Sequence, residues 1–313
     1  MLYEYAVEPE CISKWDAFSY LTEKFGIPTG RLISDYPSGW IEAVDSLCKE
    51  FTFRQRQVMI DELARLSRQA LISSGRSFDD NKPWKQNALE QYVRRAFRAV
   101  IATHNNSEPP YVLAADNIRN RLEDSNPLWN IPREDALPRT VDALGNAIIL
   151  LLQMSKHIFF VDYKFSPFEE RWKKTLAHFI KIAVSGRADI PSFEYHVKID
   201  DDEYMKDEDE RQAEFLEDCN KNLSNLIPVN IQLRIVRWDV KAGLDGGEGM
   251  HARYVLTEKG GVKIDWGLDA GKRGQTTDVS LMDDHLWKKR YGMFNEKAKV
   301  LEFVDAITVC GRG

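Results

Sequence analysis

The sequence predicts a chain of two parts, a helical first part and an α/β second part with a mixed sheet. Three observations predict this fold class. The chain has 313 residues and is 43% apolar, which is enough for one large core or two ordinary ones. Residues 1–150 show helical periodicity interrupted by prolines. Residues 151–313 instead alternate short β-branched runs with helical segments, a pattern typical of an α/β domain.

Helical periodicity dominates the first part. Apolar side chains recur at near-helical spacing in residues 54–73, and residues 87–104 repeat the pattern with Leu89, Val93, Phe97 and Ile101. Prolines mark the loops between these segments. A further helix at residues 140–154 is apolar nearly all round, which is typical of a central helix. We therefore expect residues 1–150 to form a helical domain that serves recognition or binds a protein partner.

Short strands and helices alternate in the second part, residues 151–313. The run HIFFV at residues 157–161 predicts a strand, and a helix is expected at 168–184. A second strand follows at 193–199, a polar helix at 207–222 and a third strand at 230–238. Residues 252–257 and 262–266 read as a hairpin around two glycines. This order predicts a largely parallel or mixed sheet.

Composition and charge narrow the functional class. The net charge is −6 and the pI about 5.7, so the molecule is not a polycation and any anion site must be local. The four cysteines lack CxxC spacing, which favours reduced thiols over a disulfide framework or a zinc site. The first ten residues lack a signal-peptide pattern, and the longest apolar run, 147–152, is too short to cross a bilayer. We expect a cytoplasmic protein.

Residues 250–274, MHARYVLTEKGGVKIDWGLDAGKRG, carry the clearest chemical pattern. His251 and Arg253 stand two apart on a predicted strand, so their side chains share one face. This spacing resembles that of phosphodiester-cleaving enzymes of the phospholipase D type, whose histidine sits in an H-x-K-x4-D pattern; there the imidazole attacks phosphorus and the lysine holds the phosphate oxygens. His251, Arg253 and Glu258 stand at these spacings. Arginine in place of lysine still binds phosphate, and does so bidentately.

The same stretch resembles the phospholipase D superfamily, in particular the phospholipase-D-like domain at the C-terminus of microtubule-interacting-and-trafficking domain proteins. The H-x-R motif, the turn at Gly260-Gly261 and the run Gly267-Leu268-Asp269 follow the order of that family. Upstream, residues 158–180 resemble its first strand, turn and first long helix, with Asp162-Tyr163-Lys164 in the turn where the family has proline. The resemblance covers about residues 156–295, and the first part of the chain lies outside it.

The resemblance implies both a fold and a chemistry. It implies a phospholipase-D-like α/β domain at residues 151–313, in which His251 is the nucleophile or general acid and Arg253 holds the phosphate. Glu258 or Asp269 would orient the histidine. No metal or cofactor is implied, because the attack passes through a phosphohistidine. Enzymes of the superfamily need two such motifs, so a single copy implies a homodimer that places two His251 side chains across one phosphate.

Further cations are candidate phosphate contacts. They are Lys164 in the turn, Lys263 on the second hairpin strand, and Lys272 and Arg273 just after Asp269. A second literal H-x-K motif, His196-Val197-Lys198, falls on a predicted strand, and we interpret it as a strand that happens to carry these residues.

A basic region in the first part predicts contact with nucleic acid. Residues 54–98 hold eight arginines and two lysines against five acids. Arg94, Arg95 and Arg98 share a predicted helical neighbourhood with Tyr92 and Phe97, so cations would follow the phosphates while the aromatic rings stack on bases. The acidic run at residues 200–210 is interpreted as a solvated loop, because it lacks the glycine and spacing of a calcium loop. A metal-dependent nuclease built on that run remains a minor alternative.

These patterns lead to two functional hypotheses. The first is a phosphodiester-recognising protein of the phospholipase D superfamily, either a metal-independent nuclease or a nucleic-acid sensor in a prokaryotic antiviral defence system. The second is a non-catalytic adaptor that binds anionic lipid or a protein partner through a degenerate domain, as the trafficking-type relatives bind phosphoinositide membranes. Nucleic acid, a second copy of the chain and a protein partner are thus the expected partners, ahead of a membrane.

Overall fold

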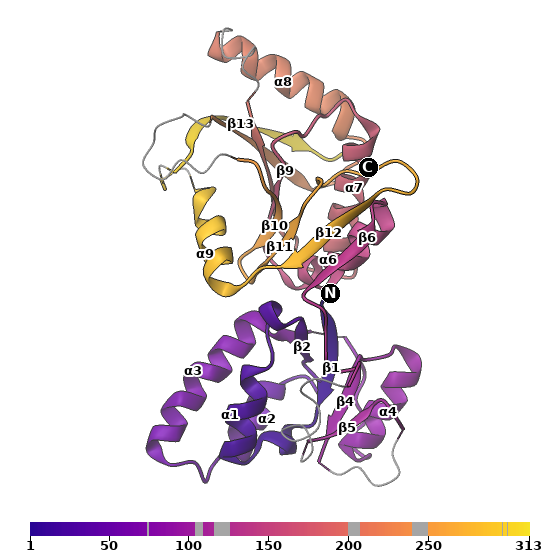
Figure 1. Ribbon diagram of the computed structural model, residues 1–313, viewed down its shortest axis with the longest axis vertical. Coiled ribbons are helices and arrows are strands. Elements are labelled where there is room, and N and C mark those ends of the chain that lie inside the picture. Colours follow the sequence, from indigo (N-terminus) through magenta and orange to yellow (C-terminus); the bar gives the residue numbers. More distant parts are fainter. Residues whose placement is uncertain are drawn as a thin grey trace. The chain divides into compact units, whose positions relative to one another are not determined.

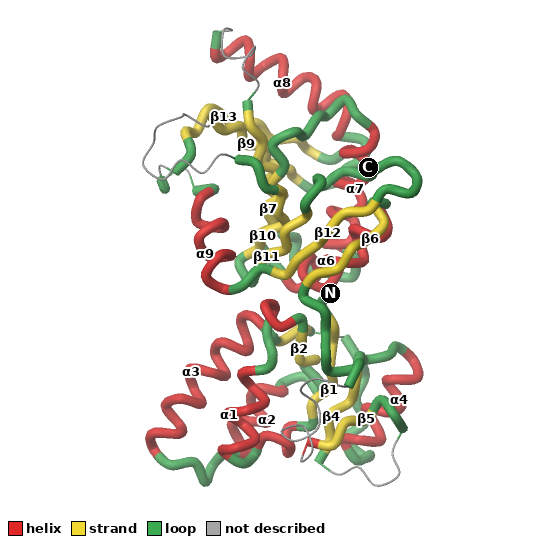
Figure 2. The backbone as a smooth tube through the Cα atoms, viewed as in Figure 1, coloured by secondary structure: helices red, strands yellow, loops and turns green. Residues whose placement is uncertain are grey.

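The computed structural model describes residues 1–73, 75–103, 109–115, 126–199, 207–239, 250–295, 297–298 and 300–313. These residues form two compact units, Met1–Arg133 and Glu134–Gly313, called here the N-terminal unit and the C-terminal unit. Both units combine helices with a sheet, and the sheet of the C-terminal unit is mixed (Figures 1 and 2). The structure thus confirms a chain that mixes helices and strands, with a mixed sheet in its second part.

The N-terminal unit is built on a five-stranded parallel sheet in the order β3-β2-β1-β4-β5. Its strands are β1 (Tyr3–Val7), β2 (Arg31–Ser34), β3 (Leu71–Ile72), β4 (Ala99–Ala102) and β5 (Val112–Ala114). Alternate side chains of β1 enter different cores, Tyr5 and Val7 on one face of the sheet and Ala6 on the other. Both faces of this sheet are therefore buried.

Helices cover both faces of this parallel sheet. They are α1 (Trp15–Glu23), α2 (Trp40–Leu47), α3 (Phe53–Gln69) and α4 (Trp84–Arg94), with short 3-10 turns at η1 (Pro9–Ile12) and η2 (Ile27–Thr29). Side chains of α1, α2 and α3 join the core that contains Tyr5, whereas Ala88 of α4 joins the core that contains Ala6. Helix α3 begins at a capping box in which the side chains of Thr52 and Gln55 each bind the other residue's backbone N–H.

The expectation of a purely helical first part is corrected by this sheet. The segment 87–104, predicted as one helix, ends its helix at Arg94 and continues as strand β4. The other strands of the sheet have two to five residues. Strands buried on both faces are short, continuous apolar runs without the alternation that marks a half-exposed strand. Such runs are easily taken for parts of helices or loops.

The C-terminal unit contains an eight-stranded sheet in the order β13-β9-β8-β7-β10-β11-β12-β6. The strands are β6 (Glu134–Pro138), β7 (His157–Val161), β8 (Ser192–Lys198), β9 (Gln232–Asp239), β10 (Arg253–Thr257), β11 (Gly261–Ile264), β12 (Thr276–Leu281) and β13 (Glu302–Cys310). Strands β7, β8 and β9 are parallel to one another, and every other neighbouring pair is antiparallel.

Four helices flank this mixed sheet within the described residues (Figure 1). They are α6 (Val141–Met154), α7 (Glu170–Val184), α8 (Glu208–Leu223) and α9 (Asp284–Met293). Helices α6 and α7 pack closely on each other. At Gly145 there is no room for a side chain, since a Cβ atom there would lie 2.5 Å from His178 Nε2. The strands and helices expected between residues 157 and 257 are found within a few residues of their predicted bounds.

The division between the parts lies earlier than expected. Strand β6 pairs with β12, and α6 packs on α7, so both elements belong to the C-terminal unit and the boundary falls after Arg133 instead of near residue 150. The apolar surface of α6 is thus covered by later elements of the chain.

All four cysteines lie in the described residues. Cys11, Cys48 and Cys219 are buried, Cys310 is exposed, and none of the four forms a disulfide. Within the described ranges, no helix combines the length and the apolar character needed to cross a bilayer.

Candidate anion-binding site

One edge of the C-terminal sheet collects charged side chains from segments far apart in the sequence. Strand β10 runs antiparallel to β7, with Tyr254 opposite Val161, so the start of β10 lies beside the end of β7. Asp162 follows β7 and Arg253 begins β10, and Arg253 Nε lies 3.8 Å from Asp162 Oδ1. The antiparallel pairing of β11, β12 and β6 brings the loop after β11 and Arg139, which follows β6, to the same edge.

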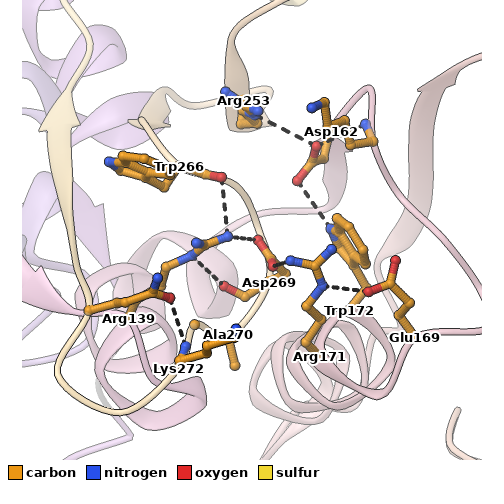
Figure 3. A pocket seen from close by; sticks show the side chains of 13 residues that line it. Arg139, Asp162, Glu169, Arg171, Trp172, Arg253, Trp266, Asp269, Ala270 and Lys272 are labelled. Carbon is orange, nitrogen blue, oxygen red and sulfur yellow. Dashed lines mark hydrogen bonds and ion pairs between the residues drawn. The ribbon is translucent and has the colours of Figure 1, made fainter.

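Two neighbouring cavities of about 670 Å³ each open at this edge. They share a wall made by Lys164, Glu169, Arg171 and Trp172. The first cavity is also lined by Arg139, Asp162, Arg253, Trp266, Asp269, Ala270, Gly271, Lys272 and Gln275, most of which are labelled in Figure 3. The second is completed by Tyr163, Lys198, Met250 and His251. Because of the shared wall, we treat them as one groove.

A buried carboxylate holds two arginines at the first cavity (Figure 3). Asp269 is 1% exposed, and one of its oxygens bonds the Arg139 guanidinium while the other lies 3.0 Å from Arg171 Nη1. Arg139 also donates to the backbone carbonyls of Asp269 and Trp266, each at 3.2 Å. These contacts hold both guanidiniums in place before any ligand arrives.

A second buried carboxylate organises the backbone around the groove. Asp162 accepts hydrogen bonds from the Leu268 N–H (2.9 Å), the Trp172 indole (3.3 Å) and the Lys164 N–H (3.1 Å). It thereby joins the turn after β7 to the loop that carries Asp269. Gly267 in this loop has φ +135°, and a Cβ atom there would lie 2.5 Å from Asp269 Oδ1, so a side chain is excluded at this position.

Arg253 lines the first cavity with its guanidinium partly engaged. Its Nη1 donates to the Asp265 carbonyl (3.0 Å) and its Nη2 to the Tyr163 hydroxyl (3.1 Å), and the guanidinium stands 4.6 Å from the centre of the Tyr163 ring. The side chain is 18% exposed. A guanidinium held in this way presents its remaining N–H groups in a fixed direction.

Arg171 is the more accessible of the two arginines bound to Asp269. Its side chain is 45% exposed, packs 3.9 Å from the centre of the Trp172 ring, and donates to Glu169 at 2.8 Å. The hydrogen bond that Arg171 donates to Glu169 raises the pKa of Arg171 above its ordinary value despite partial desolvation, and Asp269 and Asp162 add to the effect. The side chain is therefore a permanent cation within the wall that the two cavities share.

His251 lies at the second cavity, near Arg253, as the spacing of the motif predicts. Its ring is exposed and approaches the Tyr163 ring edge-on, with 6.0 Å between centroids. No carboxylate of the described residues hydrogen-bonds to it. The predicted orienting roles of Glu258 and Asp269 are therefore wrong: Asp269 is held by Arg139 and Arg171, and Glu258 accepts the N–H groups of residues 156 and 157 at the opposite edge of the sheet.

The second H-x-K motif behaves as the strand interpretation predicts. His196 is fully buried, and its Nδ1 accepts a hydrogen bond from the Trp238 indole at 3.0 Å. Burial, with a smaller effect from Arg234, lowers the pKa of His196 to about 3, so the ring stays neutral near pH 7. Lys198, at the same edge of the sheet, nevertheless lines the second cavity. The motif thus supplies a cation to the groove and a core residue, but no second catalytic histidine.

The candidate phosphate contacts divide into two groups. Lys164 and Lys272 line the groove. Lys263 Nζ lies 2.6 Å from Asp265 Oδ1, and Arg273 is exposed. Neither residue lines either of these two cavities.

Some cations and one exposed aromatic residue of the groove were not predicted as binding residues: Arg139, Arg171, Lys198 and Trp266. Arg139 follows strand β6, which was not predicted, and Arg171 stands in the mixed-charge start of α7. No motif distinguished these residues.

The basic region of the N-terminal unit is arranged differently from the prediction. Helix α4 ends at Arg94, so Arg95 and Arg98 lie beyond it. Arg98 donates to the Pro127 carbonyl at 2.6 Å, and Arg95 lies 3.8 Å from Glu4. The predicted stacking of Phe97 on bases is wrong, because this ring is only 2% exposed and is covered by Arg76 at 3.6 Å.

The acidic run falls partly outside the described residues. Residues 200–206 lie there, and the rest of the run begins α8. Within the described ranges, no three His, Cys, Asp or Glu side chains are grouped as metal ligands.

Comparison with known proteins does not place the chain in a family. No protein-family model matches it, and neither does any curated protein. One similar structure is that of TrmBL2, an archaeal chromatin protein with a novel mode of DNA binding, at 9% identity and a TM-score of 0.27 over 60% of each chain. Another is polyphosphate kinase from Porphyromonas gingivalis, at 14% identity and a TM-score of 0.29 over 76% of this chain and 35% of the kinase. At these scores neither likeness bears on function.

Proposed function

We propose that the protein recognises phosphodiester or phosphate-ester anions through the groove of its C-terminal unit. The observation that carries the proposal is the pair of guanidiniums held on the buried Asp269, at a cavity that also receives Arg253. Planar guanidiniums in a fixed position match the oxygens of a phosphate group. The arrangement resembles a receptor for an anion more than an ordinary surface ion pair.

The charge balance of the groove supports an anionic ligand. The cations that line it are Arg139, Arg171, Arg253, Lys164, Lys198 and Lys272, and the carboxylates are Asp162, Asp269 and Glu169. Six cations against three carboxylates leave a formal excess of three positive charges, on a chain whose net charge is −6. A local positive site on an acidic molecule attracts anions to one place instead of coating it with them.

Within one chain, the geometry favours binding over catalysis. A phosphohistidine mechanism needs a nucleophile and a general acid, and His196 is buried and neutral while His251 has no orienting carboxylate among the described residues. Catalysis would therefore require two His251 side chains from two copies of the chain.

The superfamily assignment belongs to the same proposal. A strand, a turn bearing Asp162, a long helix and an H-x-R strand next to the first strand support a degenerate phospholipase-D-like domain. Nucleic acid is the ligand we favour, as in a nucleic-acid sensor of a prokaryotic defence system. An adaptor for anionic lipid is the competing hypothesis, and it is supported equally well by a groove to which the described residues contribute a single histidine, His251.

The test of the proposal is a binding measurement with matched variants. Fluorescence anisotropy with single- and double-stranded DNA and RNA, and sedimentation with phosphoinositide-containing vesicles, would be compared for the wild type, Arg171→Ala and Arg94→Ala. We expect Arg171→Ala to weaken binding. Arg94→Ala tests the predicted nucleic-acid contact of the N-terminal unit through an exposed arginine of α4, and it should leave binding unchanged if the groove is the binding site. Absence of binding to every one of these ligands by the folded wild type would refute the proposal.

Catalysis is tested separately from binding. Cleavage of the same nucleic acids and of bis-p-nitrophenyl phosphate would be measured with EDTA present, for the wild type and His251→Ala. EDTA-resistant turnover that disappears in the variant would establish a phosphohistidine enzyme and would require a dimer. Binding without turnover would support recognition alone.

A further inference from the structure

Trp266 presents an exposed indole at the first cavity. It is 65% exposed, whereas Trp172 and Met250, which also line the two cavities, are buried and Tyr163 is half-buried. Its backbone is fixed on both sides, because its N–H donates to Thr277 Oγ1 at 3.2 Å and its carbonyl accepts from Arg139 Nη2 at 3.2 Å. The ring therefore stands on a rigid support instead of a free loop.

The position of the indole relative to the cations gives it a specific use. The Arg139 guanidinium lies 6.0 Å from the centre of the Trp266 ring and is tied to Asp269, which also holds Arg171 (Figure 3). An anion on Arg171 would thus share the first cavity with an aromatic surface. In a nucleotide, a phosphate and a planar base are separated by one sugar, so both contacts can be made together.

The groove is also longer than one phosphate group requires. Each cavity has a volume of about 670 Å³, and they are joined along the wall that contains Arg171. The second cavity adds Lys198 and His251 beyond that wall. Cations on both sides of a shared wall suit a ligand that carries successive phosphates.

We propose that the ligand is a single-stranded nucleic acid with one base stacked on Trp266 and neighbouring phosphates along the groove. The inference rests on the proposed function and names its ligand. A paired base is stacked inside its duplex, so only an unpaired base is free to cover the indole. A membrane surface suits the site less well, because the cations line cavities and Trp266 is flanked by Asp265, which is itself about half exposed.

The experiment separates the base from the phosphates. Anisotropy titrations would compare a labelled hexanucleotide of single-stranded DNA with an abasic hexamer that carries the same phosphates. We expect the wild type to bind the hexanucleotide roughly 5- to 150-fold more tightly, the range for one stacked base. Trp266→Ala should remove this preference without changing the affinity for the abasic hexamer, and Trp266→Phe should keep part of it. Phe53→Ala, an aromatic of the N-terminal unit that is 82% exposed, serves as the matched control and should behave like the wild type.

The outcomes distinguish failure of this inference from failure of the proposed function. Equal wild-type affinity for both hexamers would overturn the stacking subsite and leave anion recognition intact. Absence of binding to either hexamer would overturn the proposal that the ligand is a single-stranded nucleic acid. Binding to phosphatidylcholine vesicles with phosphatidylinositol 4-phosphate that depends on Trp266, without such dependence for the hexanucleotide, would replace it with a lipid surface. If the folded wild type also ignores those vesicles and double-stranded nucleic acid, the proposed function fails.

Discussion

The two units use arginine in different ways. In the N-terminal unit Arg76 is 2% exposed, lies over Phe97 and bonds Glu4 at 2.8 Å, and Arg98 covers Tyr3 at 4.5 Å. These side chains complete the fold. In the C-terminal unit Arg171 is tied to a buried carboxylate yet keeps nearly half of its side chain exposed toward a cavity. The number of arginines in a segment therefore does not identify an anion site, whereas the way in which carboxylates and rings hold them does.

The largest effect should come from removing the carboxylates that hold the two sets of arginines. Asp269→Asn leaves Arg139 without its buried counter-charge and should lower the free energy of unfolding by about 3 kcal/mol or more. Glu4→Gln should also destabilise the protein, because Arg76 is buried. Urea unfolding and anisotropy would be measured for both variants under conditions in which they are folded. Only Asp269→Asn should weaken anion binding. An equal loss of affinity in Glu4→Gln would show that the arginines of the two units do not differ in this respect.

Acid should destabilise the C-terminal unit through His196. The folded pKa of this buried ring is about 3, below the ordinary value of 6.5, so the unfolded state takes up the proton first as the pH falls. Stability is complete above about pH 6.5 and is lost toward pH 3, by about 1.4 kcal/mol per pH unit. Urea unfolding would give the free energy of unfolding of the wild type and of His196→Gln at pH 7.5 and pH 5. Between these two pH values the wild type should lose roughly 2 kcal/mol more than the variant. Equal losses would show that His196 does not control the acid response.

A smaller effect, on affinity alone, is expected from the exposed arginines. Arg171→Ala removes charge-assisted hydrogen bonds to the ligand and should lower the affinity for a single-stranded oligonucleotide by about 10- to 100-fold. Arg94→Ala should leave it within about twofold, since this side chain lies on α4 outside the groove. Titrations at two salt concentrations would measure both variants. Similar losses in the two variants would mean that the basic region of the N-terminal unit also binds the oligonucleotide.

The smallest effect on stability should follow from His251→Ala. The ring is exposed, so the free energy of unfolding should change by less than about 0.5 kcal/mol. Oligonucleotide affinity should fall less than in Arg171→Ala, because His251 lines only the second cavity whereas Arg171 lines both. Thermal unfolding and anisotropy would check both points. A large loss of stability would instead identify His251 as a packing residue.

Local patterns were sufficient for much of the C-terminal unit. Strand β7 begins and ends where the run HIFFV does, and β8, β9, β10, α7 and α8 lie within a few residues of their predicted bounds. The H-x-R spacing also brought His251 and Arg253 to neighbouring parts of one groove. These features depend on periodicity and on residues close in sequence.

The failures involve long-range contacts. Strand β4 was hidden in a helical pattern because its four residues are apolar on both faces. The partners of Asp269 were missed because Arg139 and Arg171 stand 130 and 98 positions away and meet it only when β6, β11 and β12 pair and α7 packs beside them. No local spacing encodes such a meeting.

By itself the sequence determined that this is an α/β chain with a mixed sheet in its second part and a histidine-arginine pair at one edge of that sheet. The tertiary structure decided which charges are available to a ligand. The physical reason is that an arginine has the same charge wherever it stands, but burial, a counter-ion and an open cavity determine whether that charge stabilises the fold or faces a ligand. Those three conditions arise only when distant segments pack together.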